Sequence, residues 1–189
     1  MQLNRKKLAF VAAWTMSAVG TVYPKNATDH LQRLVEMSAR RLAIAEQIAL
    51  AKWDSGTPVE DASREAEVIA NAVKMGDSRG LDQATTSNFF RAQVEANKLV
   101  QYSLLAEWRR LGKAPDHAPV DLAGTIRPEL DQLGTELIAE LRETGVLRAS
   151  ASCRSDVAKA VGKYVSAHKD KFSPLRIIAL DRATAAVCS

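Results

Sequence analysis

The chain has 189 residues, six Pro and nine Gly, and a formal net charge of +4. This length suits one domain with a sizeable core, and a composition rich in Ala and Leu with few β-branched runs favours an all-helical fold. The basic residues are spread along the chain, and no basic patch with interleaved aromatic residues appears, which argues against nucleic-acid binding. Small acidic molecules therefore stay open as ligands.

The first 20 residues have the pattern of a secretory signal peptide. A basic segment at residues 5–7 precedes an apolar segment at residues 8–19. Ala18 and Gly20 occupy the −3 and −1 positions if cleavage falls before Thr21. The alternative is a membrane anchor, but about 12 apolar residues are too few to span a bilayer. We expect residues 1–20 to be removed, and residues 21–189 to be periplasmic or secreted without membrane association.

Three helices are predicted in the first part of the mature chain from apolar periodicity and capping residues. They are Thr28 to about Asp54, a second that follows Asp61 as its N-cap and ends near Gly76, and a third that follows Asp82 and reaches about Leu111. A polar connector at residues 112–119 follows. No β-hairpin signal and no internal repeat competes with this assignment.

Three more helices are predicted towards the C-terminus. The fourth begins at Leu122 or Pro128, ends near Thr144, and carries an apolar stripe. The fifth covers residues 153–169 with Ser152 as its cap, and the sixth covers residues 174–187 after Ser173. We therefore expect a single-domain all-α bundle of about six helices, with a core at residues 28–145 and a C-terminal helical segment at 146–189.

Two cations lie on one face of the first helix. Arg41 and Lys52 are eleven residues apart, which places them within about 20° around the axis and about 16 Å along it, with Ala45 and Ile48 between them. A charge buried on such an apolar stripe needs an anionic partner, either a carboxylate of the chain or a bound anion. The alternative is that both side chains extend along the surface to solvent.

The second and third helices add further polar groups. Arg64 and Glu65 lie in the first turn of the second helix, where a cation adds to the positive end of the helix dipole and so favours an anion. Asn97 and Gln101 share one face of the third helix, and buried amides must be hydrogen-bonded. Arg64 could instead pair with Glu60 or Glu67 at the surface, and the two amides could satisfy each other.

The only two cysteines, Cys153 and Cys188, lie near the C-terminus. In an exported chain an even count favours a disulfide, whose loop of about 36 residues would stabilise the fold by roughly 3–4 kcal/mol. Two free thiols are the alternative. The three histidines are scattered and make no metal-ligand spacing with the cysteines, so no metal site is expected.

Taken together, the polar positions resemble the active-site pattern of the all-helical chorismate mutases. The residues that carry the resemblance are Arg41, Lys52, Asp61, Arg64, Glu65, Asn97 and Gln101. The segments V-E-D-A-S-R-E and F-F-R-A-Q-V-E-A-N-K, the signal sequence and the late cysteine pair are similar to the secreted, gamma-type subclass. The resemblance covers about Leu31 to Leu141, and implies that three or four helices form the active site.

The resemblance implies rearrangement of chorismate to prephenate without a cofactor. Arg41 and Arg64 would each hold a substrate carboxylate through the guanidinium fork. Lys52 and Gln101 would donate to the ether oxygen, where negative charge grows in the transition state. Glu65 would accept a hydrogen bond from the ring hydroxyl.

Three further positions are implied by the same resemblance. The backbone of Asp61 would lie near the ring hydroxyl, and Asn97 would line a carboxylate. A further cation, which a partner chain supplies in dimeric cytoplasmic members, would here be Arg127 of the same chain. In some secreted members this arginine falls nearer Glu136, which cannot replace it, and Arg40 is expected to face solvent.

Two other functions fit the same residues. An isochorismate-pyruvate lyase shares the fold and most of the cations, although Glu65 and the secreted architecture favour the mutase. A non-catalytic periplasmic helical binding protein would leave the cations without an anion. Whether the chain forms a homodimer stays open at this stage.

Overall fold

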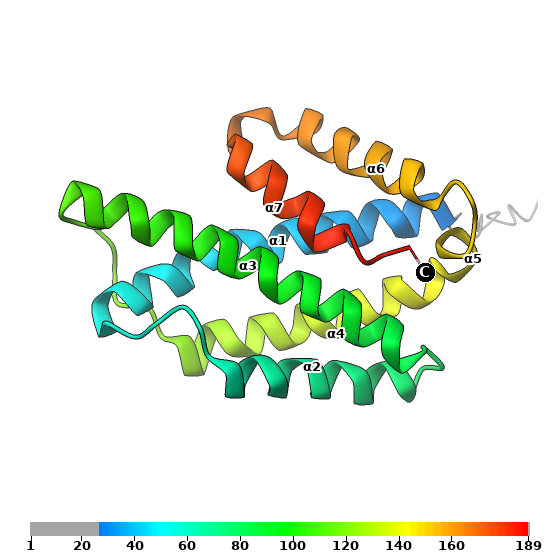
Figure 1. Cartoon of the computed structure of the whole chain (residues 1–189), viewed down its shortest axis with the longest axis horizontal. Coiled ribbons are helices and arrows are strands. Elements are labelled where there is room, and N and C mark those ends of the chain that lie inside the picture. The colour runs from blue at the N-terminus through cyan, green and yellow to red at the C-terminus, as the bar shows by residue number, and fades with distance from the viewer. Residues whose placement is uncertain (1–26, 189) are drawn as a thin grey trace, which may run out of the picture.

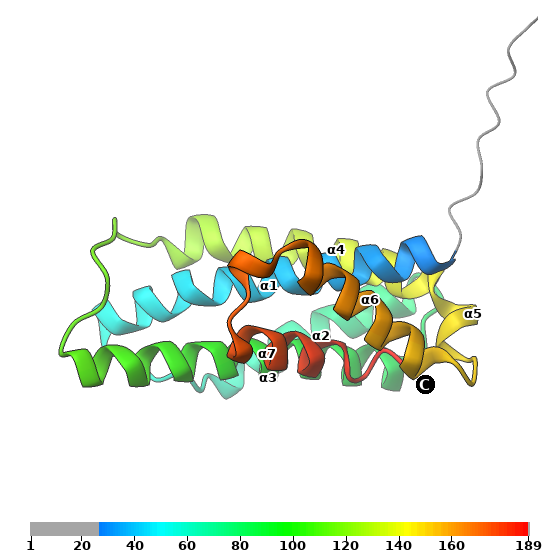
Figure 2. The ribbon, with the colours of Figure 1, turned by 90° about the horizontal axis from the view of Figure 1, so that it is seen from above.

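Two central helices of 29 residues each, α1 (Ala27–Ser55) and α3 (Gln83–Leu111), organise the structure. In this computed structural model, which describes residues 27–188, α2 (Ala62–Asp77) and α4 (Arg127–Glu143) lie on one side of the pair. The C-terminal helices α6 (Cys153–Ala167) and α7 (Pro174–Thr184) lie on the other side (Figures 1 and 2). No strand occurs among residues 27–188, so the expected all-α bundle is confirmed.

The capping residues expected from the sequence set the helix limits. The Asp61 side chain accepts from the Arg64 backbone N–H at 3.0 Å, and the Asp82 side chain accepts from Thr85 N–H at 2.8 Å. Gly112 ends α3 with a φ of 72°, a left-handed conformation that glycine adopts without steric cost. Local sequence therefore determines where α2 and α3 begin and where α3 ends.

The apolar stripe expected on the first helix is the centre of the core. Leu34, Val35, Ala45 and Ala49 are fully buried, whereas Ile48 is only partly buried. The α4 stripe packs against the same core through Leu137, Ile138 and Leu141. Leu133 is also buried, in a smaller cluster with Ile44 and Ile126. Burial of these side chains at roughly 1.5–3 kcal/mol each holds the helices together.

The fourth helix combines the two starting points that the sequence offered. A π-helical turn, η1 (Leu122–Ile126), comes first and is capped by Asp121, whose carboxylate accepts from the backbone N–H groups of Ala123 and Gly124. The α-helix α4 then begins at Arg127, with Pro128 in its first turn, where the missing N–H costs nothing. Arg127 is thereby fixed at the junction of the two elements.

The C-terminal helices are shorter than predicted. After Thr144 the chain forms one extra helical turn, α5 (Gly145–Arg148), which the sequence had not indicated. Helix α6 ends at Ala167, before a short turn η2 (Lys169–Lys171), rather than at residue 169. Ser152 occupies the N-cap position of α6 but makes no capping hydrogen bond, because its backbone is already helical there.

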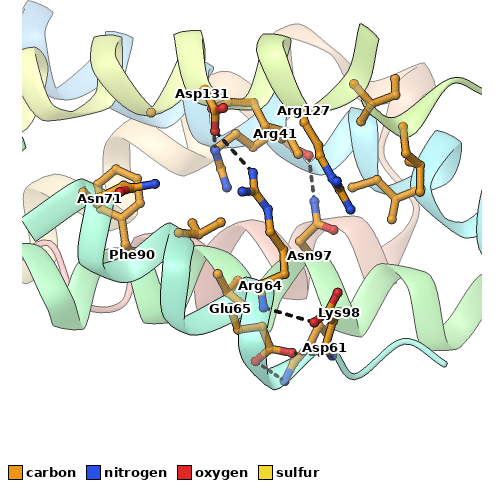
Figure 3. A pocket seen from close by; sticks show the side chains of 18 of the residues that line it. Arg41, Asp61, Arg64, Glu65, Asn71, Phe90, Asn97, Lys98, Arg127 and Asp131 are labelled. Carbon is orange, nitrogen blue, oxygen red and sulfur yellow. Dashed lines mark hydrogen bonds and ion pairs between the residues drawn. The ribbon is translucent and has the colours of Figure 1, made fainter. Parts of the chain in front are cut away.

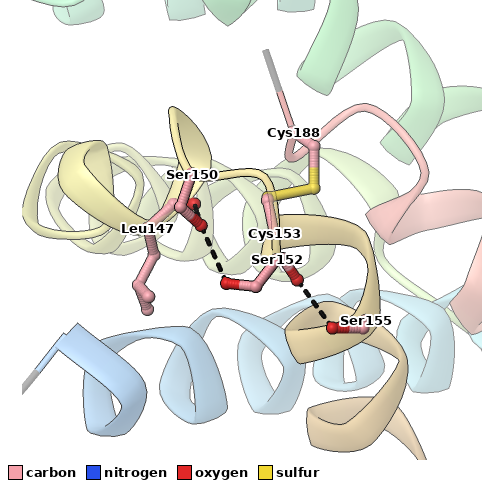
Figure 4. Close-up of a disulfide and its surroundings, with 6 residues drawn as sticks. All are labelled: Leu147, Ser150, Ser152, Cys153, Ser155 and Cys188. Atoms are coloured by element: carbon pink, nitrogen blue, oxygen red, sulfur yellow. Dashed lines mark hydrogen bonds between the residues drawn. A yellow bond between two sulfur atoms is a disulfide. The ribbon is translucent and has the colours of Figure 1, made fainter.

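The expected disulfide explains why α7 stops early. Cys153 and Cys188 are joined, with their Cα atoms 5.8 Å apart, at the start of α6 (Figure 4). Helix α7 ends at Thr184 rather than at residue 187, so the last residues can leave the helix axis and reach Cys153. The bridge therefore joins the residues that follow α7 to the start of α6.

The predicted signal peptide at residues 1–20 lies outside the described residues. Among residues 27–188, no helix is long and apolar enough to cross a membrane.

Candidate active site

A cavity of about 160 Å³ lies between α1, α2, α3, α4 and η1 (Figure 3). It brings together all of the predicted catalytic and substrate-binding residues, which are Arg41, Lys52, Asp61, Arg64, Glu65, Asn97, Gln101 and Arg127. They come from four helices of one chain. The prediction that three or four helices form the site thus agrees with where the structure places these residues.

Apolar side chains form most of the remaining cavity wall. They are Ile48, Val59, Val68, Ala72, Met75, Phe90, Val94, Leu122, Ile126 and Leu130. Such a wall excludes water and strengthens electrostatic interactions inside the cavity. Of the two residues expected between Arg41 and Lys52, Ile48 faces the cavity, whereas Ala45 packs into the core.

The charges around the cavity are unequal. Its five cations are Arg41, Lys52, Arg64, Lys98 and Arg127, and its three carboxylates are Asp61, Glu65 and Asp131. Lys98 and Arg64 are paired with carboxylates of the chain, some of which lie outside the cavity. Arg41, Lys52 and Arg127 form no ion pair with any described residue, so a dianion would supply partners that these cations lack.

Arg41 is the most buried of these cations, with 5% of its surface exposed. Its Nη1 donates to the backbone oxygen of Leu130 at 3.0 Å, while its Nε is buried without a hydrogen-bond partner among the described residues. Burial lowers the pKa of Arg41 to about 10, so the guanidinium is still charged at neutral pH. Such a desolvated, partly unsatisfied cation gains strongly from a bound carboxylate.

Lys52 is held by the backbone of the segment that precedes α2. Its Nζ donates to the Val59 oxygen at 2.6 Å, which leaves two N–H donors for a ligand. Burial lowers the pKa of Lys52 below its ordinary value, and the carboxylates of Asp61 and Glu65 act in the opposite direction. The ammonium group is thus fixed at one end of the cavity.

A chain of hydrogen bonds orients Gln101. The backbone oxygen of Arg41 can only accept, so it takes a hydrogen bond from Asn97 Nδ2 at 3.0 Å. Asn97 Oδ1 then accepts from Gln101 Nε2 at 2.7 Å. Gln101 Nε2 keeps a second hydrogen for a ligand, because an amide nitrogen has two. The alternative in which the two amides satisfy each other is therefore present, and it leaves a donor free.

The first turn of α2 carries the other expected groups. Glu65 Oε1 accepts from the Asp61 backbone N–H at 3.2 Å. Arg64 pairs with Glu67 at 2.9 Å, as the surface alternative predicted, and also with Asp131 of α4 at 3.4 Å. Both Arg64 and Glu65 nevertheless line the cavity.

Lys98 is a site residue that sequence reasoning missed. Its side chain is 12% exposed and contacts Glu60, Glu65 and Glu95 at 2.8, 3.1 and 2.9 Å. These carboxylates raise the pKa of Lys98 even though burial opposes them. Lys98 therefore fixes the second oxygen of Glu65. The only sequence signal that Lys98 belongs to the site was its position next to Asn97.

Arg127 and Asp131 form the α4 side of the cavity. The Arg127 side chain points towards Asn97 (Figure 3) and forms no ion pair with any residue in the described part of the chain. Asp131 was not predicted. Arg40 is half exposed and lies 3.8 Å from Glu136, so neither of these belongs to the cavity.

Within residues 27–188, no group of three or more His, Cys, Asp or Glu side chains could hold a metal ion. His30 instead pairs with the buried Glu140 at 2.6 Å, and His117 pairs with Asp54 at 3.0 Å.

Comparison with known proteins identifies related sequences. The family described as "Chorismate mutase type II" matches residues 29–102. A protein of Mycolicibacterium smegmatis named "Secreted chorismate mutase" is 30% identical over 183 residues, which cover 96% of this chain and 99% of that protein.

Two solved structures have the same fold. The chorismate mutase of Burkholderia phymatum superposes with a TM-score of 0.81 at 45% identity, over 86% of this chain and 98% of that chain. The chorismate mutase of Burkholderia thailandensis gives a TM-score of 0.79 at 33% identity, over 84% of this chain and 99% of that chain.

Proposed function

The chain belongs to the chorismate mutase family, and we propose that it rearranges chorismate to prephenate in the cavity between α1, α2, α3 and α4. The observation that carries this proposal is a cavity with a largely apolar wall and three cations, Arg41, Lys52 and Arg127, that form no ion pair with the described residues. Chorismate is a dicarboxylate, so its two negative charges supply partners that these cations lack. The M. smegmatis relative is named a secreted protein, which agrees with the export expected from residues 1–20. The chain is secreted.

The protein forms no covalent bond with the substrate in this reaction. One C–O ether bond of chorismate breaks while one C–C bond forms, and no atom enters or leaves. No proton transfer, nucleophile or cofactor is required. The enzyme must hold a flexible dianion in a compact reactive shape and stabilise charge that grows on the ether oxygen.

Arg41 and Arg64 bind the two carboxylates in this proposal. Arg41 is buried, and its unsatisfied Nε gives a carboxylate a partner in a water-poor region. Arg127, which forms no ion pair with the described residues, adds a third cation at the α4 end of the cavity. Holding both ends of the substrate supplies the compact shape.

Lys52 and Gln101 act on the reacting oxygen. Each has a protein hydrogen bond that fixes its position and at least one donor left over. A fixed donor needs no reorganisation when charge develops, so it stabilises the transition state more than the ground state. Glu65, held by Lys98 and the Asp61 N–H, accepts a hydrogen bond from the ring hydroxyl of the substrate. Asn97 orients Gln101 and also lies beside a substrate carboxylate.

The test is incubation of the purified mature protein with chorismate and identification of the product. Formation of prephenate, abolished in a folded Arg41→Ala variant, supports the proposal. Release of pyruvate from isochorismate would favour the lyase. Tight binding of chorismate without any turnover would favour the non-catalytic binding protein.

The sequence leaves open whether the chain forms a homodimer. Since every proposed site residue lies on one chain, we propose that catalysis does not depend on dimerisation. Light scattering at assay concentrations, combined with activity measured over a hundredfold dilution, tests this. Loss of specific activity on dilution would contradict it.

A further inference from the structure

Asp131 is a carboxylate inside a cavity that is built for a dianion. It lies on α4, and its Oδ1 is 3.4 Å from Nη2 of Arg64. Figure 3 shows it on the same side of the cavity as Arg41, whose Nη1 donates to the oxygen of the preceding residue, Leu130. Asp131 is therefore placed beside both arginines that are proposed to hold the substrate carboxylates.

An empty cavity would be unfavourable without such a group. Arg41 and Arg64 repel each other, and this repulsion adds to burial in lowering the pKa of Arg41, whereas Asp131 raises it. A buried cation that lacks any nearby anion costs several kcal/mol. Asp131 reduces that cost while no ligand is bound.

The contact is also weak enough to be broken. The Asp131 side chain is 69% exposed, and its distance from Arg64 is at the long end for an ion pair. Asp131 also borders a shallow surface groove between α2 and α4, which is lined by Asn71, Lys74, Met75, Ser78 and Thr135. A small rotation of its side chain would therefore move the carboxylate from the cavity to solvent.

Lys98 and its partners, in contrast, form a close and largely buried ion-pair network. Three carboxylates surround Lys98 within 3.1 Å, and its side chain is 12% exposed. Such a network holds Glu65 in place, because moving Glu65 away would break its ion pair with Lys98 at a high cost in free energy. Two of the three carboxylates of the cavity thus differ: Glu65 is fixed, whereas Asp131 can leave.

We propose that Asp131 is a displaceable counter-ion, which neutralises Arg41 and Arg64 in the empty cavity and yields its place to a substrate carboxylate. This proposal rests on the proposed function. The carboxylate competes with any dicarboxylate ligand, so it weakens the binding of substrate and product alike. Asp131 would then limit product retention, since prephenate carries the same two carboxylates as chorismate.

The test compares Asp131→Asn with Glu67→Gln. Both variants remove one negative charge that contacts Arg64, but only Asp131 lines the cavity. For charges about 5 Å apart in a solvent-exposed setting, Coulomb's law gives a threefold to sixfold tighter Kd for prephenate in Asp131→Asn, as a rough figure. Glu67→Gln should change this Kd less than twofold, and the difference should shrink in about 0.5 M salt.

Calorimetric titration with prephenate measures this without any turnover, so it remains informative if the chain fails to convert chorismate. Thermal unfolding of the free variants adds a second readout. Asp131→Asn should be less stable than Glu67→Gln without ligand, because the two arginines lose their shared counter-ion, and should gain more on adding prephenate. Unchanged or weaker prephenate binding in folded Asp131→Asn, or an equal effect of Glu67→Gln, would overturn the proposal.

Discussion

Replacing Lys52 by methionine should slow turnover far more than it weakens substrate binding. Methionine keeps the apolar stem of the side chain and removes only the ammonium group. Ground-state chorismate carries its negative charge on the carboxylates, which Arg41 and Arg64 still hold. The ether oxygen becomes negative only as its bond to carbon breaks, so the Lys52 donor acts mainly in the transition state.

The structure sets the size of this effect. Lys52 is half buried at the end of an apolar cavity, and its Nζ is fixed by the Val59 oxygen at 2.6 Å. Loss of one preorganised donor in such a site lowers kcat by about 10²–10³, which is about 3–4 kcal/mol. Loss of the hydrogen bond to Val59 should lower the free energy of unfolding by only about 1 kcal/mol.

Steady-state kinetics of chorismate consumption on Lys52→Met measures this, with circular dichroism to establish folding. Lys163→Met is the matched control, because Lys163 is exposed on α6, away from the cavity. The control should keep the parental kcat. If Lys52→Met is folded and turns over chorismate within about threefold of the parent, the proposed site is wrong.

Three further predictions follow from the site and the fold. Because Gln101 donates at any pH, kcat/KM should stay flat through neutrality and fall on the alkaline side, where Lys52, whose pKa burial lowers, loses its proton. Gln101→Glu should confine activity to acidic pH. A steep loss of kcat/KM between about pH 5 and 7 in the parent would count against the role of Gln101. Arg41→Lys keeps the charge but loses the fork, so KM should rise about tenfold or more in steady-state assays, and an unchanged KM would place the carboxylate elsewhere. Reduction of the Cys153–Cys188 bridge should lower the free energy of unfolding by roughly 3–4 kcal/mol in denaturant titrations while initial activity is kept, and detection of two free thiols in the native protein would remove its basis.

Helix positions were predictable because the signals that set them are local. Asp61 and Asp82 were expected as caps from their place before an apolar run, and both accept the backbone N–H that a cap must satisfy. The alignment of Arg41 with Lys52 follows from the geometry of one helix, and both line the cavity. Periodicity within one element therefore carries reliable information on which side chains share a face.

Lys98 and Asp131 were missed because their roles depend on other helices. Lys98 gains its partners from Glu60 and Glu65, which precede and open α2, and from Glu95 on its own helix. Asp131 looks like an ordinary exposed residue of an amphipathic helix, and only the packing of α4 beside α2 brings it to Arg64. A charge pattern along one helix does not indicate which charges a neighbouring helix will bring close.

Three donors of the site are anchored by main-chain oxygens. Lys52 donates to Val59, Arg41 to Leu130 and Asn97 to the oxygen of Arg41, so the backbone holds these three donors. The positions of these oxygens depend on how α1, α2, α3 and α4 pack.

The C-terminal helices contribute to that packing from the other side of the bundle. Gln93 of α3 donates to Ser38 of α1 at 2.8 Å and to the Ala183 oxygen of α7 at 3.1 Å, which joins the three helices through a single buried amide. The disulfide keeps the end of α7 in place. Because a donor displaced by about 1 Å can lose much of its effect on a developing charge, we expect α7 to support catalysis through this packing, without contact with the substrate.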